Sequence, residues 1–203
     1  MDNTALFKVG YGLYVLTAHA EGKDNGCIIN TVLQITSGSP FVGVFSVNKQ
    51  NHTHDMIVKS RRCSVSVLTE ETPFEVFKHF GFQSGKTVDK FADYNDVARD
   101  EHGILYLTRH ANAYLSFEIT DTFDFGSHTL FKGNIVAGEV LGKADSATYA
   151  YYQRHIKPVP QPTQKVGYRC NICGYIYEGE PLPEDFVCPL CKHGASDFVR
   201  TAD

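Results

Sequence analysis

Apolar residues recur at every second position along much of the chain before Leu141, which is the pattern of half-buried β-strands. The segments with this pattern, or with a short continuous apolar run, are 9–20, 27–36, 41–48, 63–68, 104–107, 113–125 and 130–141. Between the first two, Asn25-Gly26 is the strongest hairpin signal and predicts a turn over residues 21–26. Mostly antiparallel strands with few helices predict a small closed β-barrel.

Helical patterns are short and few. Residues 51–62 place Met56 and Ile57 on one face, with Ser60 beside them. The sequence TPFE at residues 72–75 has the form of a capping box with proline at the first helical position, and predicts a helix that ends at Gly81. Residues 148–156 predict a final short helix, whereas residues 81–103 are polar and irregular.

A proline-rich stretch divides the chain into two domains. Residues 157–164 read KPVPQPTQ, with proline at every second position. Such a composition favours polyproline II, so we expect a short, semi-rigid linker. The predicted domains are a β-rich one over residues 1–156 and a small one over residues 165–203.

Composition places the chain among ordinary globular proteins. Hydrophobic residues make up 42% of its 203 residues and charged residues 21%, with a formal net charge of −4. The absence of a basic stripe argues against nucleic acid as a partner. With neither a signal peptide nor a long apolar run, we expect a cytoplasmic protein with no membrane association. Thiols stay reduced there, and Cys27 and Cys63 are predicted to be small buried side chains.

The other four cysteines form two Cys-x-x-Cys pairs, Cys170 with Cys173 and Cys188 with Cys191. Each pair can bend its backbone into a knuckle that directs both sulfurs to one ion. Four thiolates in a tetrahedron are compatible with zinc or with iron. The spacing alone therefore predicts a metal site without deciding the metal.

The residues around these pairs favour iron. GYIY follows the first pair at residues 174–177, Pro189 lies inside the second, and LPEDFV at residues 182–187 leads into it. This stretch resembles rubredoxin, whose single iron in four cysteines carries one electron and has no open coordination position. Lys192 stands where that family usually has glycine, at a turn that favours positive φ, and the stretch between the pairs is shorter than in free-standing rubredoxins. A structural zinc ribbon is the alternative.

Polar residues interrupt the predicted strands of the large domain in two places. Asn30, Thr31 and Gln34 lie in one strand, and SVNK at residues 46–49 ends the next. Thr53 lies near the start of the following helix. Hydroxyls, a lysine and helix N-terminal amides that converge can bind a monophosphate. A second polar loop follows at residues 84–91.

Four motifs in this order resemble the flavin reductase family: NTVLQIT at residues 30–36, SVNKQNHT at 46–53, SGKTVDKF at 84–91 and HTLFKG at 128–133. The resemblance implies a split β-barrel that forms a homodimer and binds FMN near the subunit interface. It implies that the phosphate and ribityl chain are held by Asn30, Thr31, Ser46, Asn48, Lys49 and Thr53. It also implies that the residues near the phosphate or ring are Gln34, Ser84, Gly85, Lys90 and Phe91. His128, at the start of a strand, is interpreted as structural.

The two resemblances together predict an electron-transfer oxidoreductase. Electrons from NADH or NADPH would pass through FMN to a four-cysteine iron, and then to a protein acceptor such as a flavodiiron protein that reduces oxygen or nitric oxide. No proton-abstracting side chain is required, so no catalytic residue is predicted. Two alternatives stay open: a reductase of free flavin or ferric complexes with a structural zinc ribbon, and a non-enzymatic flavin-binding module. The sequence does not distinguish NADH from NADPH.

Overall fold

The computed structural model describes residue 5, residues 8–158 and residues 167–201. Its contacts divide the chain into two compact units, Met1–Lys157 and Pro158–Asp203. Most of the predicted proline-rich linker, residues 159–166, lies outside the described residues. Within the described part of the chain, none of the helices has the length and apolar character that crossing a membrane requires.

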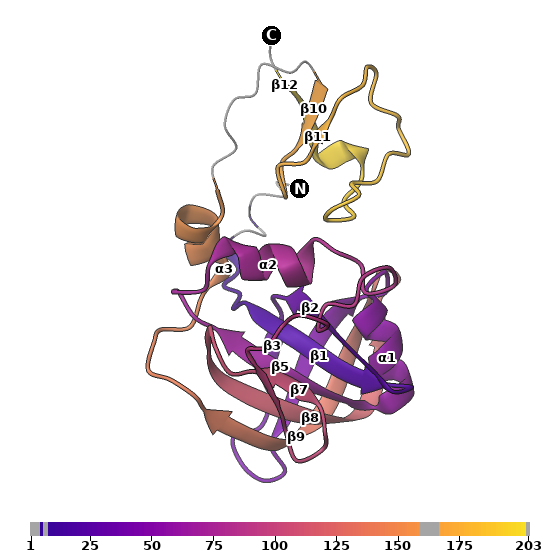
Figure 1. The fold of residues 1–203 in the computed structure, drawn as a ribbon. Coiled ribbons are helices and arrows are strands. Elements are labelled where there is room, and N and C mark those ends of the chain that lie inside the picture. The colour runs from indigo at the N-terminus through magenta and orange to yellow at the C-terminus, as the bar shows by residue number, and fades with distance from the viewer. Residues whose placement is uncertain (1–4, 6–7, 159–166, 202–203) are drawn as a thin grey trace. The chain divides into compact units, whose positions relative to one another are not determined.

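A seven-stranded antiparallel sheet builds the first unit, in the order β2-β1-β5-β8-β9-β4-β3 (Figure 1). Its strands are β1 Tyr14–Ala20, β2 Lys23–Ile29, β3 Val32–Gln34, β4 Val42–Asn48, β5 Arg62–Leu68, β8 Ala111–Asp124 and β9 His128–Val140. The two edge strands, β2 and β3, are separated in the chain only by Asn30 and Thr31. One bent stretch thus forms both edges, which closes the sheet into a barrel. The predicted mainly-β barrel is confirmed.

Alternating residues of these strands fill the barrel. Phe45, Phe117 and Phe131 are at most 1% exposed. The Phe45 ring stacks on Phe131 at 5.4 Å and meets the edge of Phe117 at 5.3 Å between centroids. Helix α1 (His52–Ser60) adds Met56 and Ile57 to the same cluster, as its pattern predicted. The barrel interior is therefore a packed hydrophobic core.

Helix α2 (Phe74–Gly81) packs on the outside of the sheet, above the strands in the view of Figure 1. Its buried side chains, Phe77 and Phe80 among them, belong to a second core cluster that includes Val15 and Leu68. The predicted capping box is wrong, because no side chain caps this helix. The Thr72 hydroxyl instead accepts from the backbone N–H of Thr69 and donates to the carbonyl of His110.

Several predicted boundaries are also wrong. The first strand begins at Tyr14, and the first hairpin turns at Glu21-Gly22, where both residues have positive φ. Asn25-Gly26 lies inside β2 and is buried. The strand predicted over residues 27–36 is split into β2 and β3, and the final helix is α3 (Tyr149–Tyr151) followed by a π-helix, Tyr152–Ile156.

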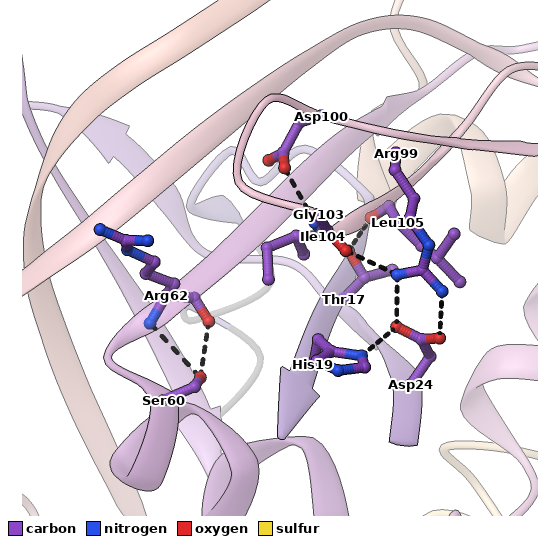
Figure 2. A network of polar contacts seen from close by, with 10 residues as sticks. All are labelled: Thr17, His19, Asp24, Ser60, Arg62, Arg99, Asp100, Gly103, Ile104 and Leu105. Carbon is purple, nitrogen blue, oxygen red and sulfur yellow. Dashed lines mark hydrogen bonds and ion pairs between the residues drawn. The ribbon is translucent and has the colours of Figure 1, made fainter. Parts of the chain in front are cut away.

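The segment predicted to be irregular contains a strand, β6 (Val97–Arg99), which pairs with β7 (Leu105–Leu107). Figure 2 shows how polar contacts fasten this hairpin to the barrel: the Arg99 guanidinium donates to both carboxylate oxygens of Asp24, at 3.1 and 2.7 Å. On the other side of Asp24, His19 Nδ1 lies 2.9 Å from Oδ1. Burial alone would raise the pKa of Asp24, but the hydrogen bonds from Arg99 and His19 outweigh it and hold the pKa below its usual value.

The second unit is a three-stranded sheet with a small aromatic core. Its order is β11-β10-β12, with β10 Gly167–Cys170, β11 Ile176–Tyr177 and β12 Phe198–Thr201. Phe186 lies between Tyr177 and Phe198, with ring centroids 4.7 and 5.3 Å away. These rings pack against the buried Cys170 and Cys188.

Candidate functional site

The four paired cysteines of the second unit form one cluster. Their sulfur atoms all lie within 4.8 Å of one another. The Sγ atoms of Cys170 and Cys191 are 3.5 Å apart, and those of Cys173 and Cys188 are 3.4 Å apart. A tetrahedral metal with bonds of about 2.3 Å to sulfur sets its ligands about 3.8 Å apart. The cluster therefore has the size of a site for one tetrahedral metal ion.

The two knuckles repeat the same backbone geometry. The N–H of Gly174 donates to the carbonyl of Cys170 at 2.9 Å, and the N–H of Lys192 donates to that of Cys188 at 3.0 Å. Gly174 has φ of 81° and Lys192 has φ of 64°. The prediction of a positive-φ turn at Lys192 is confirmed, and this lysine adopts a conformation that disfavours residues with a Cβ.

The four ligands differ in their access to solvent. Cys170 and Cys188 are 1% and 0% exposed, whereas Cys173 and Cys191 are half-buried. The second cysteine of each pair therefore lies on the surface side of the cluster. With four thiolates around it, a metal here has no position for a substrate, so its chemistry is limited to structure or electron transfer.

The first unit contains an open pocket of about 180 Å³ at the bend between β2 and β3. It is lined by Ile28, Ile29, Asn30, Thr31, Ser46, Asn48, Asn51 and His128. Four of the predicted flavin-binding residues are thus brought together. Thr31 donates to the side-chain oxygen of Asn30 at 3.1 Å. Asn51 precedes α1 without making a side-chain cap hydrogen bond, and a helix N-terminus of this kind suits an anion.

The pocket opens on the outer face of the barrel. Phe45 and Val47 of β4 are fully buried, so Ser46 and Asn48 between and beyond them point outward. Asn48 pairs with His128 across the β4–β9 ladder. The pocket therefore lies between the bend and the outer surface of two neighbouring strands, separate from the packed barrel core.

Exposed apolar side chains continue from this pocket across the same face. Leu33 pairs with Val44, and Leu130 pairs with both Ser46 and Phe123. Cross-strand partners share one face of a sheet. Leu33 is 58% exposed and Phe123 49% exposed. An apolar surface of this kind, next to a polar pocket, is typical of a binding face.

Two predicted residues, Lys49 and Gln34, are not among the residues that line the pocket, and their side chains make other contacts. Lys49 donates to the carboxylate of Asp124 at 2.6 Å, which holds the pKa of that exposed carboxyl below its usual value. Gln34 is exposed on the edge strand β3 and donates to the carbonyl of Thr36 at 2.7 Å. A flavin contact for either residue stays a prediction.

The other five predicted residues also lie outside the pocket lining. Thr53 is fully buried and accepts from the side-chain amide of Asn25 at 3.0 Å. Lys90 is 2% exposed, and its ammonium donates to two backbone carbonyls. Phe91 packs on Phe80, with ring centroids 5.5 Å apart. The remaining two, Ser84 and Gly85, begin the loop that leads to Lys90.

Sequence reasoning missed part of the pocket lining. Ile28 and Ile29 gave no polar signal, and Asn51 was treated only as part of a motif. A free helix N-terminus beside Ser46 and Asn48 was the signal that could have found Asn51. His128, interpreted as structural, does line the pocket, where its Nδ1 lies 2.9 Å from the hydroxyl of Ser127.

Comparison with known proteins agrees with this arrangement. Residues 6–160 match the model of the flavin reductase like domain. The chain belongs to this family. Residues 168–199 match the rubrerythrin, rubredoxin-like domain. A high molecular weight rubredoxin from Moorella thermoacetica is 39% identical over 230 aligned residues, which cover 98% of this chain and all of that protein. Ferric-chelate reductase (NAD(P)H) from Archaeoglobus fulgidus is 40% identical and covers 75% of this chain and 89% of its own length.

Solved structures share the fold of the first unit. The NADH:FAD oxidoreductase of Streptomyces globisporus has a TM-score of 0.63 at 22% identity and covers 72% of this chain and 88% of its own. Flavoredoxin from Methanosarcina acetivorans has a TM-score of 0.58 at 22% identity, covering 67% of this chain and 75% of its own. Family membership and the four-thiolate cluster together support FMN and a single iron as cofactors, and an NAD(P)H-dependent flavin oxidoreductase as the enzyme class.

Proposed function

We propose that the protein takes electrons from NADH or NADPH through FMN and passes them, by way of the four-cysteine iron, to a second protein. The observation that carries the proposal is the presence of both parts in one chain: a flavin reductase-like unit, and a metal cluster closed to substrates. FMN can accept a hydride and return its electrons singly, whereas a four-thiolate iron carries one electron at a time. The chain is then a converter between the two kinds of carrier.

The residues of the pocket would position the flavin. The hydroxyls of Ser46 and Thr31, the amides of Asn30 and Asn48, and the N-terminus of α1 offer hydrogen-bond partners for a phosphate and a ribityl chain. No titrating side chain is needed, because hydride transfer depends on distance and orientation. The role of this chain's residues is then to bind and orient the cofactor.

A second copy of the chain would complete the flavin site. The pocket of about 180 Å³ is smaller than the roughly 300–1,000 Å³ typical of cofactor sites. One subunit would therefore enclose only part of a flavin. The exposed apolar residues Leu33 and Phe123 on the same face give a second subunit a surface to cover. This supports the expected homodimer with FMN near the subunit interface.

Electrons would leave through the more exposed side of the iron site. Cys173 and Cys191 are the ligands with access to solvent, so an acceptor that docks there comes nearest to the metal. A flavodiiron protein that reduces oxygen or nitric oxide is the acceptor we propose, since rubredoxin-like domains commonly deliver electrons to such proteins.

An anaerobic titration of the purified protein with NADH, followed by visible absorption, tests this function. We expect the flavin band and the ferric-thiolate band both to bleach, the second only when flavin is present. A flavin band that bleaches over a metal site without colour would contradict the proposal, because zinc cannot carry an electron. NADPH in a parallel titration gives the nucleotide preference.

The variant Cys173→Ser separates the two parts of the reaction. It should abolish electron delivery to the protein acceptor while the rate of flavin reduction by NADH stays nearly unchanged. Cys63→Ser is the matched control, since this buried cysteine lies in the barrel core outside the metal cluster. A parallel loss of flavin reduction in Cys173→Ser would show that the two units do not divide the reaction in this way.

A second candidate function is ferric-complex or free-flavin reduction. The 40% identity to a ferric-chelate reductase over 75% of the chain favours it. In that case the second unit would be dispensable, and Cys173→Ser would retain full reduction of a ferric chelate by NADH. The same variant therefore distinguishes the two candidates.

A further inference from the structure

Lys90 is a buried lysine whose ammonium binds only backbone in the described contacts. Its Nζ donates to the carbonyl of Gly26 in β2 and to that of Phe80 in the last turn of α2, each at 2.8 Å. The side chain is 2% exposed. A cation at the C-terminal end of a helix is also favoured by the helix dipole. Lys90 therefore ties α2 to the edge strand of the barrel.

The other end of the same loop packs against the neighbouring residue of β2. Gly85 approaches Asn25 so closely that a Cβ on Gly85 would clash with the Asn25 carboxamide. The Asn25 amide in turn donates to Thr53 in α1 at 3.0 Å. The loop over residues 84–90 thus meets two consecutive residues of β2: Gly85 packs closely on Asn25, and Lys90 is hydrogen-bonded to Gly26.

That strand leads directly into the pocket. Asn25 and Gly26 are followed by Cys27, and then by the four lining residues 28–31 at the bend between β2 and β3. An edge strand has only one strand partner, so its position on the free side depends on other contacts. Lys90 and Gly85 supply part of those contacts, beside the ion pair of Asp24 with Arg99 and the hydrogen bond from Asn25 to Thr53.

We propose that Lys90 is a positioning residue: it fixes the 84–90 loop and α2 against β2, and thereby sets the shape of the flavin pocket without touching the phosphate. Two of the three N–H donors of the ammonium bind backbone carbonyls, and the side chain is 2% exposed, which argues against a role as an anion ligand. Burial removes water from this cation and lowers the pKa of Lys90 below its usual value. The two backbone carbonyls partly replace the lost hydration. The inference rests on the flavin site proposed above.

The experiment compares FMN with riboflavin, which lacks the phosphate. Both are titrated into the flavin-free full-length protein and its Lys90→Met variant. We expect the Kd for each flavin to rise by the same factor, about tenfold. This is less than the two lost charge-assisted hydrogen bonds contribute together, because Lys90 acts on the pocket only indirectly. The ratio of the two constants should therefore stay constant. Lys86→Met removes a lysine from the same loop that is exposed and 3.7 Å from Asp55, and should leave both constants unchanged.

A second measurement does not depend on flavin. Hydrogen exchange of the flavin-free protein should be faster in Lys90→Met at residues 84–91 and 24–31. If Lys90→Met does not fold, Gly85→Ala is the second variant, because its Cβ would push the loop away from Asn25. It should raise the Kd for FMN and the Kd for riboflavin by the same factor. A rise in the Kd for FMN alone would identify Lys90 as a phosphate ligand and overturn the inference. Hydrogen exchange that is unchanged in Lys90→Met would overturn it as well. If the unmodified protein binds neither flavin, the proposed function fails, and exchange still decides the role of Lys90.

Discussion

Lys192 gives the sharpest prediction, because the two metal knuckles offer an internal comparison. Gly174 and Lys192 occupy equivalent turns, with φ of 81° and 64° and nearly equal hydrogen bonds to Cys170 and Cys188. A residue with a Cβ costs roughly 1–2 kcal/mol in this conformation. Glycine avoids that cost but loses about 0.5–1 kcal/mol through the greater freedom of the unfolded chain. Lys192→Gly should therefore stabilise the iron-loaded unit by about 0.5–1 kcal/mol.

The reverse change at the first knuckle should have the opposite sign. Gly174→Ala introduces a Cβ at φ of 81° and should destabilise the unit by about 0.5–1 kcal/mol by the same reasoning. The measurement is the guanidinium concentration at which the ferric-thiolate absorption of the full-length protein is half lost. It should rise for Lys192→Gly and fall for Gly174→Ala.

Lys192→Ala separates backbone strain from the loss of the lysine charge. Alanine keeps the Cβ at the same φ, so its midpoint should lie close to that of the unmodified protein. If Lys192→Ala stabilises as much as Lys192→Gly, the effect comes from the side chain and the reasoning from φ is refuted. Equal signs for Lys192→Gly and Gly174→Ala would refute it as well.

Two further predictions concern the first unit. Arg99→Met removes a two-bond ion pair with Asp24 and should lower the free energy of unfolding by about 1 kcal/mol at pH 7. Because Arg99 and His19 hold the pKa of Asp24 below its ordinary 3.8, the ion-pair part of this difference should be complete above that pH and should be lost as the pH falls through the folded-state pKa. The hydrogen bond from Arg99 to the carbonyl of Gly103 does not titrate and accounts for what remains. A difference in urea unfolding that does not change with pH would contradict the ion-pair account. Ser46→Ala should weaken FMN binding about fivefold in a flavin titration, whereas Ser60→Ala, whose hydroxyl donates to the carbonyl of Arg62 at the far end of α1, should leave it unchanged.

Local patterns in the sequence predicted the features that depend on local chemistry. The strands of the barrel have alternating buried positions, such as Phe45 and Val47, and these produce the two-residue period directly. The metal cluster needed only the spacing within each cysteine pair. Residues brought together over long distances could not be predicted in this way: Arg99 meets Asp24 across 75 positions, and nothing in either neighbourhood indicates the other.

The bend between β2 and β3 shows why a stretch correctly predicted to be β-rich was still assigned as one strand instead of two. Apolar residues predominate on both sides of Asn30 and Thr31 within residues 27–36, so the local pattern predicts one strand. Closure of the barrel requires a stretch that pairs with β1 at its start and with β4 at its end. Asn30 and Thr31 lie where the pairing changes, and their polarity was the only local trace of the change. Four of the predicted flavin-binding residues line the pocket, and each was noticed because it is polar. The bend was missed because it depends on how the whole sheet pairs.

The turn predicted at Asn25-Gly26 was wrong for the same reason, because contacts distant in the sequence decide the structure there. These contacts also bear on the proposed flavin site. The pair is buried in β2 because each residue is needed there: the Asn25 amide binds Thr53, and a Cβ on Gly26 would lie 3.2 Å from the Phe80 ring. The carbonyl of Gly26 also accepts from Lys90. Tertiary contacts that outweigh a strong local turn signal must themselves be strong. These contacts hold β2, which runs into the pocket. The residues that keep Asn25 and Gly26 in the strand are therefore the same ones that we expect to set the shape of the flavin site.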